Sequence, residues 1–219
     1  MIKYVVFDFD GTLVDSKAVF ISVFNQLAEK HGFKKIELSN IEILRKLSIK
    51  ERCKHINLPL YKIPFLSAEL LNLYKKSIKD IVLIEGIKEL IDRLNEHGLQ
   101  VAIISSNSEN NIRQFLEHNG IDTIKAIYCS SNILGKDKVI KRFLKTYKLH
   151  SSEIIYVGDE QRDIIASKIN KVKVIWVGWG YDIQETAASE QPNYIANTPD
   201  EILDIVLSNK AFDHEVISF

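Results

Sequence analysis

The sequence has few cysteines, and they are poorly placed for bonding or for metal chemistry. Its 219 residues include only Cys53 and Cys129, which lie far apart and outside any Cys-x-x-Cys pair or Cys/His cluster. This disfavours a small disulfide-stapled domain and a cysteine-based metal site. We expect two free thiols in a reducing compartment.

The sequence also lacks a charge imbalance and a long apolar run. Lys and Arg total 29, and Asp and Glu total 29, so nothing indicates a nucleic-acid or anionic-membrane partner. No apolar stretch approaches the roughly 18–20 residues of a membrane span. The first ten residues, MIKYVVFDFD, carry charges where a signal peptide has its apolar segment. We therefore expect a cytoplasmic protein with no membrane or nucleic-acid partner.

What the chain does contain is an alternation of short apolar runs with amphipathic helical patterns. The predicted strands are residues 4–9, 100–104, 125–129, 153–157 and 173–177. The predicted helices are residues 86–97, 109–119, 137–147, 160–169 and a last one from about residue 199. Continuous apolar strands with intervening helices are typical of a parallel sheet covered on both faces. The predicted fold class is α/β, with a doubly wound parallel sheet.

One interval interrupts this alternation. From about residue 17 to residue 79 the apolar residues recur at helical spacing, and no convincing strand is found. This predicts an all-α cap domain of residues 16–81, inserted into a core domain of residues 1–15 and 82–219.

Two aspartates end the first predicted strand, in the stretch VVFDFDGT. Residues two apart on a strand share a face, so Asp8 and Asp10 would point the same way, with Phe9 opposite. Two unpaired carboxylates are costly to bury, and a cation such as Mg²⁺ would relieve that cost. An Asp-Gly turn explains Asp10 and Gly11 but leaves Asp8 unexplained.

Polar residues also follow the second and third predicted strands, at the edge where ligands bind in such sheets. Ser105 and Ser106 either cap the next helix or bind a phosphate together with helix N–H groups. Lys136, with Lys138 as its rival, is either a surface lysine or a cation that neutralises a phosphate oxygen.

A second acidic cluster follows the fourth predicted strand. Asp159 comes directly after Gly158, and Asp163 lies four residues later, where the two could share a helix face. Acids in a first helical turn also suit the helix dipole, which accounts for Glu160 and Asp163 more readily than for Asp159.

These four sites, in this order, resemble the haloacid dehalogenase-like superfamily of phosphatases. The matching motifs are Asp8-Phe9-Asp10-Gly11-Thr12, Ser105, Lys136, and Gly158-Asp159 with Asp163. The phosphoglycolate phosphatase-like branch is the most similar, through Leu13-Val14-Asp15-Ser16 and Val177-Gly178-Trp179-Gly180-Tyr181. The resemblance implies a helical cap just after the first motif, which is where the strand pattern breaks.

The resemblance also implies roles for these residues. Asp8 would be the nucleophile that forms an aspartyl-phosphate, and Asp10 the general acid and base. Mg²⁺ would be held by Asp8, the backbone carbonyl of Asp10 and Asp159.

The remaining motif residues would support this chemistry. Gly11, Ser105, Ser106 and Lys136 would bind the phosphate. Among the supporting residues, Thr12 would steady the loop or orient Asp10, and Asp163 would act through a water or by holding Lys136.

The implied activity is hydrolysis of a small phosphorylated metabolite, such as a phosphoglycolate-like phosphomonoester, by a monomer or homodimer. Arg45 and Lys46 in the cap are candidate substrate contacts, or else exposed charges of an amphipathic helix. A phosphosugar mutase and a catalytically silent binding or regulatory member are the alternatives. A dehalogenase is disfavoured, because that branch lacks an acid at the position of Asp10.

Overall fold

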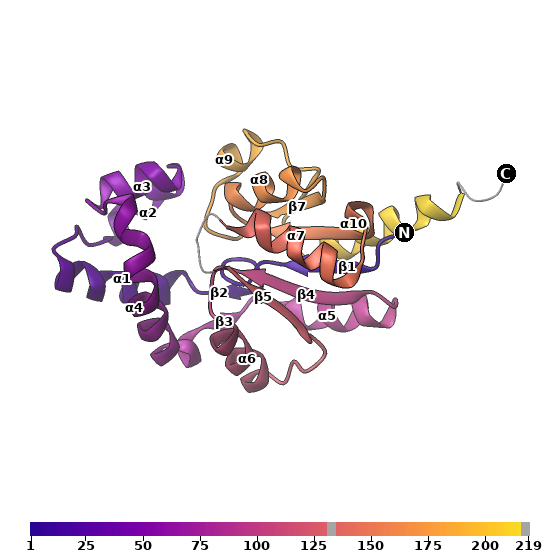
Figure 1. The fold of residues 1–219 in the computed structure, drawn as a ribbon, viewed down its shortest axis with the longest axis horizontal. Coiled ribbons are helices and arrows are strands. Elements are labelled where there is room, and N and C mark those ends of the chain that lie inside the picture. Colours follow the sequence, from indigo (N-terminus) through magenta and orange to yellow (C-terminus); the bar gives the residue numbers. More distant parts are fainter. Residues whose placement is uncertain (131–134, 216–219) are drawn as a thin grey trace.

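The computed structural model describes residues 1–130 and 135–215 of the chain. A six-stranded parallel sheet lies at its centre (Figure 1). The strands are β1 (Tyr4–Phe7), β4 (Gln100–Ser105), β5 (Ala126–Cys129), β6 (Ile154–Gly158), β7 (Lys173–Val177) and β8 (Tyr194–Ala196). Their order is β5-β4-β1-β6-β7-β8, so the chain extends the sheet first on one side of β1 and then on the other. The predicted doubly wound α/β fold is confirmed. Strand β8 was not predicted.

Helices cover both faces of the sheet, because alternate residues of each buried strand point to opposite sides. Val5 and Phe7 of β1 belong to the apolar cluster on one face, and Val6 belongs to the cluster on the other. The first face is covered by α5 (Ile87–Glu96), α6 (Glu109–His118) and α10 (Pro199–Glu215). The second is covered by α7 (Lys136–Tyr147), α8 (Gln161–Ile169) and the short α9 (Gln184–Ala188). A single-turn 3₁₀ helix, η4 (Ser151–Glu153), precedes β6.

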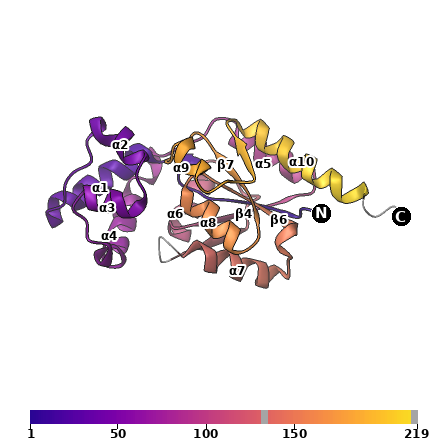
Figure 2. The same ribbon diagram turned by 90° about the horizontal axis from the view of Figure 1, so that it is seen from above.

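The regular elements between residues 17 and 80 are all helical and lie beside the sheet, at one end of the molecule (Figures 1 and 2). They are α1 (Lys17–His31), α2 (Ile41–Arg45), α3 (Ile49–His55) and α4 (Ile63–Lys76), with 3₁₀ turns η1 (Leu38–Asn40), η2 (Leu60–Lys62) and η3 (Ile78–Asp80). A separate apolar cluster that includes Phe24, Leu44 and Ile56 holds them together. The insertion of helices is confirmed, whereas the domain boundaries stay a prediction.

A two-residue antiparallel pair joins the two ends of this helical segment. Strand β2 (Val14–Asp15) pairs with β3 (Val82–Leu83), so the chain leaves and re-enters the sheet-containing part at one place. Neither strand was predicted, because two residues are too few to show a period. In the described part of the chain, no helix is both long enough and apolar enough to cross a membrane.

Candidate active site

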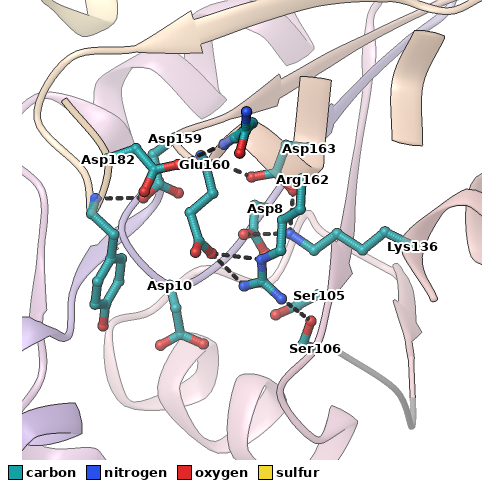
Figure 3. Close-up of polar contacts among 12 residues, drawn as sticks. Asp8, Asp10, Ser105, Ser106, Lys136, Asp159, Glu160, Arg162, Asp163 and Asp182 are labelled. Atoms are coloured by element: carbon teal, nitrogen blue, oxygen red, sulfur yellow. Dashed lines mark hydrogen bonds and ion pairs between the residues drawn. The ribbon is translucent and has the colours of Figure 1, made fainter. Parts of the chain in front are cut away.

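The first strand is shorter than its sequence predicts. β1 ends at Phe7, and the chain then turns, with the N–H of Val14 donating to the carbonyl oxygen of Phe9. The strand geometry that would place Asp8 and Asp10 on one face therefore does not persist. Figure 3 shows the carboxylate of Asp8 inside a cluster of charged side chains and that of Asp10 apart from it.

Asp8 is fully buried and ion-paired. Its Oδ1 accepts a hydrogen bond from the N–H of Phe9 at 2.7 Å. Its Oδ2 accepts no hydrogen bond from any described residue, although the Lys136 ammonium lies 2.5 Å away. Lys136 also contacts the carboxylate of Asp163. Burial lowers the pKa of Lys136, but the carboxylates of Asp163 and Asp8 outweigh it and leave that pKa above its ordinary value.

The arrangement separates the two candidate lysines. Lys136, the first residue of α7, is 2% exposed and points at Asp8, whereas Lys138 is exposed on the surface. Asp163 contacts Lys136, which is one of the two roles that the sequence analysis expects of Asp163. It also accepts a hydrogen bond from the N–H of Glu160 at 3.1 Å, so it steadies the start of α8 as well.

Asp159 is buried and held from two sides. Its Oδ1 accepts from the Thr12 hydroxyl at 2.9 Å, and its Oδ2 accepts from the N–H of Tyr181 at 2.7 Å. Thr12 therefore orients Asp159 and not Asp10. The surrounding chain is tightly fitted, since a Cβ at Gly11 or Gly180 would overlap the Asp159 carboxylate. Gly11 has φ +79°, and its N–H donates to Val14, so what it contributes here is room.

Asp10 contacts a different set of groups. The Tyr74 hydroxyl of α4 donates to its Oδ1, and the side-chain amide of Asn107 donates to its Oδ2 at 3.0 Å. Helix α6 begins after Ser105 and Ser106, and its N-cap is Ser108. Helix capping therefore does not account for Ser105 or Ser106.

The two serines lie at the edge of the charged cluster. Ser105 is buried, and its Oγ accepts a hydrogen bond from the N–H of Asn107 at 3.1 Å. Ser106 accepts one from Arg162 at 2.9 Å. Arg162 also donates to Glu160, with Nε 2.7 Å from Oε2. Arg162 thus adds a second cation, besides Lys136, to the predicted phosphate site (Figure 3).

Arginines of the helical segment reach across to the loop that follows β7. Arg45 donates to the backbone carbonyl oxygens of Gly180 and Tyr181, at 3.3 and 3.1 Å. Arg52, at 20% side-chain exposure, pairs with the buried Asp182, and its Nη1 lies 3.7 Å from Glu160. Arg45 is one of the two residues that the sequence analysis names as candidate substrate contacts, and in the structure it binds this loop.

The other named cap residue does not enter the charged cluster. Lys46 is exposed and lines a surface hollow with Ser48 and Gln161.

The donor set fits a divalent metal ion. Oxygen atoms of Asp8, Glu160 and Asp163 all lie within 4.8 Å of one another. Burial, followed by the neighbouring carboxylates of Glu160, Asp8 and Asp163, raises the pKa of Asp159 well above its usual range. A divalent cation would relieve this crowding, and carboxylate oxygens suit hard ions such as Mg²⁺. Asp159 is not a member of the close group, and its two hydrogen bonds fix the orientation of its carboxylate.

Sequence reasoning missed several residues of this site. Asn107 and Glu160 stand next to motif residues, so a search of each motif's neighbours could have found them. Arg162 lies inside the second acidic motif, where a basic residue among acidic ones would be the signal. Tyr74 and Arg52 carry no local signal, because only the packing of the helical segment against the sheet brings them here.

The chain is similar to known proteins in sequence and in fold. A family model described as haloacid dehalogenase-like hydrolase matches residues 5–177. A phosphoglycolate phosphatase of Synechococcus elongatus is 28% identical over 207 residues, covering 92% of this chain and 96% of that protein. The pyrophosphatase PpaX of Halalkalibacterium halodurans is 25% identical over 219 residues, covering 94% and 97%. The crystal structure of a predicted phosphatase from Clostridium acetobutylicum matches with a TM-score of 0.80 at 24% identity, covering 95% and 99%.

Proposed function

Because the chain belongs to the haloacid dehalogenase-like hydrolase family, we propose that it is a magnesium-dependent phosphatase. Its substrate would be a small phosphorylated metabolite, such as a phosphoglycolate-like phosphomonoester. The full-length similarity to a phosphoglycolate phosphatase supports this substrate class. The two free cysteines are compatible with a cytoplasmic setting.

One observation carries the proposal. The buried carboxylate of Asp8 stands at the end of the central strand, with Lys136 2.5 Å from an oxygen that accepts no hydrogen bond from any described residue. That oxygen is suited to attack phosphorus, because the ammonium fixes the direction of the carboxylate and its charge would offset the repulsion between a carboxylate and an anionic phosphate. Nucleophilic catalysis would split a difficult hydrolysis into formation and breakdown of an aspartyl-phosphate on Asp8.

Other residues of the site would transfer protons and bind the phosphate. Asp10 would give a proton to the leaving oxygen and later take one from the attacking water, a role that typically contributes about 10²–10⁴-fold. Lys136, Ser105 and Ser106 would bind phosphate oxygens, with Arg162 close by as a further cation.

The metal site would be built from Asp8, the backbone carbonyl of Asp10 and Asp159. The anchoring of Asp159 by Thr12 and by the N–H of Tyr181 supports it as a ligand. Mg²⁺ bound there would supply the positive charge that offsets repulsion between a carboxylate nucleophile and an anionic phosphate.

We also propose that residues 16–81 act as a cap. The contacts of Arg45 and Arg52 with the loop after β7 support this, because they hold the helical segment against the site. Such a cap would exclude bulk water and select the leaving group.

The test is phosphate release by the full-length protein from 2-phosphoglycolate, pyrophosphate and p-nitrophenyl phosphate. Each is measured with Mg²⁺ and after removal of divalent metal by a chelator. We expect metal-dependent release from a phosphomonoester, and no release by the Asp8→Asn variant.

Two results would contradict the proposal. Well-folded protein that releases no phosphate in any condition would favour a binding or regulatory role. Turnover that requires a sugar bisphosphate activator would instead favour a phosphosugar mutase.

A further inference from the structure

The hydroxyl of Tyr74 contacts the proposed general acid, Asp10, and also interacts with the side chain of Ser16. The residue lies on α4, near the end of the helical segment, and its side chain is 3% exposed. Its ring packs in the apolar cluster that also contains Leu13 and Val23. Its hydroxyl donates a hydrogen bond to Oδ1 of Asp10. A buried tyrosine usually finds a partner for its hydroxyl, and here that partner is a residue 64 positions away.

A second route links α4 to the same carboxylate. The side-chain amide of Asn107 donates to Oδ2 of Asp10 at 3.0 Å, and its carbonyl oxygen accepts from Asn111 at 3.0 Å. Asn111 also donates to the backbone carbonyl oxygen of Leu71, on α4, at 3.3 Å. Both oxygens of Asp10 therefore accept a hydrogen bond, one directly from α4 and one through two asparagines that α4 helps to hold.

This geometry bears on one step of the proposed reaction. As an oxygen of Asp8 forms its bond to phosphorus, the bond from phosphorus to the ester oxygen breaks. The proton of the Asp10 carboxyl passes to that oxygen, which departs as an alcohol. Negative charge then develops on Asp10, where the Tyr74 hydroxyl and the Asn107 amide are already placed to donate to it. Donors that are in position before the charge appears need no reorganisation during the step.

We propose that Tyr74 is a positioning residue for Asp10 as general acid, an inference that rests on the proposed phosphatase function. Tyr74 does not touch the phosphate in this account, and it acts only through the carboxylate. Its importance therefore depends on how much the leaving group needs a proton. An alkyl phosphate would otherwise expel an unstable alkoxide, whereas p-nitrophenyl phosphate expels a phenolate that is stable without protonation.

The experiment compares the two kinds of substrate in full-length wild type and Tyr74→Phe, with Mg²⁺ present. Phenylalanine keeps the ring in its apolar cluster and removes only the hydroxyl. The value of kcat/KM is measured for 2-phosphoglycolate and for p-nitrophenyl phosphate, because this parameter reports the steps up to loss of the alcohol. We expect kcat/KM for 2-phosphoglycolate to fall about 10- to 100-fold, as small misplacements of reacting groups do. We expect a change within about three-fold for p-nitrophenyl phosphate, which needs little acid catalysis.

Two further variants make the result specific. Asp10→Asn removes the acid itself, so adding Tyr74→Phe to it is expected to cause no further loss with 2-phosphoglycolate, the signature of two residues acting as one unit. Tyr194 lies on β8, and its hydroxyl donates to Asn209 at 2.8 Å. Tyr194→Phe removes this hydroxyl and is expected to leave the ratio of the kcat/KM values for the two substrates unchanged.

The outcomes distinguish failure of the positioning role from failure of the proposed phosphatase function. Wild type that hydrolyses neither substrate would overturn the phosphatase proposal, and the positioning role with it. Active wild type together with a Tyr74→Phe variant that slows both substrates equally, or neither, would overturn the positioning role alone. Additive losses in the double variant would do the same.

Discussion

The ammonium of Lys136 lies 2.5 Å from Oδ2 of Asp8, and the two side chains are 2% and 1% exposed. The same ammonium contacts Asp163, so one buried cation holds two buried carboxylates. Charges removed from water in this way are tolerated because they are paired. The pairing orients the carboxylate of the proposed nucleophile, so we expect Lys136 to matter for both folding and catalysis.

Removing Lys136 is therefore expected to affect stability as well as activity. Lys136→Ala removes the cation that lies between two buried carboxylates, and breaking a buried ion pair in this way typically costs about 3–5 kcal/mol. We expect this loss in urea unfolding, together with a fall in kcat of about 100-fold or more through lost phosphate contacts. Lys138→Ala is the matched control, because Lys138 is exposed on the same helix. Equal effects of the two substitutions would contradict the assignment.

The two aspartates of the first motif are expected to differ when replaced. Asp8→Asn removes the nucleophile and should abolish turnover. Asp10→Asn leaves the nucleophile in place, so a slow turnover or a trapped phosphoryl-enzyme should remain. Turnover of p-nitrophenyl phosphate and the mass of the intact protein after reaction measure this. Similar residual activity in both variants would show that the roles are wrongly divided.

Gly180→Ala is expected to disturb Asp159. A Cβ at this position would overlap the Cβ and the carboxylate of Asp159, which is itself fixed by two hydrogen bonds. Forcing extra atoms into a packed site typically costs about 1–3 kcal/mol. We expect weaker activation by Mg²⁺, measured as a higher metal concentration for half-maximal activity. Gly32→Asn, at a left-handed position with open space, serves as control and should leave that concentration unchanged.

Arg52→Ala is expected to loosen the contact between the helical segment and the rest of the chain. It leaves Asp182, a buried carboxylate, without its cation. Hydrogen exchange of residues 41–55 should become faster, and kcat/KM should fall about ten-fold as positioning is lost. Arg93→Ala removes an ion pair whose partner Asp200 is 82% exposed, so it should change neither quantity. Unchanged exchange in Arg52→Ala would show that this pair does not hold the segment.

Both thiols are expected to be slow to react near neutral pH. Burial raises the pKa of Cys129 to about 12 and also raises the pKa of Cys53. Because the thiolate is the reactive form and a raised pKa makes it scarce, alkylation at pH 8 should be slow in the folded protein and fast after unfolding. Its rate should keep rising with pH well above the ordinary thiol range. A folded-state rate that levels off near pH 9 would contradict these pKa directions.

Much of the fold could be predicted because buried parallel strands are continuous apolar runs. Five strands and the five long helices around the sheet were found in this way, and the interval without strands marked the inserted helices. The missed elements are short: helix α9 has five residues, β2 and β3 have two each, and β8 has three. Strands this short owe their structure to a partner strand, which local periodicity does not reveal.

The site shows the same limit. Asp8, Lys136 and Asp163 were expected together because each follows a strand, and carboxyl ends of parallel strands share one edge. The turn after Phe7 was not expected to separate Asp10 from Asp8. The hydrogen bond from Tyr74 to Asp10 depends on which side of α4 faces the sheet. The sequence of an amphipathic helix does not show which element the helix packs against.

The pairing of β2 with β3 has a consequence for how such a chain could change over time. Since Asp15 and Val82 lie opposite each other, the segment between them begins and ends at a single point on the sheet-containing part. For a flexible segment, doubling the length raises the entropic cost of closing it by only about 0.6 kcal/mol. An insertion at this point can therefore be lengthened, shortened or exchanged while the strands and their charged edge stay intact. The two short strands thus fix where an inserted segment begins and ends, whatever its length.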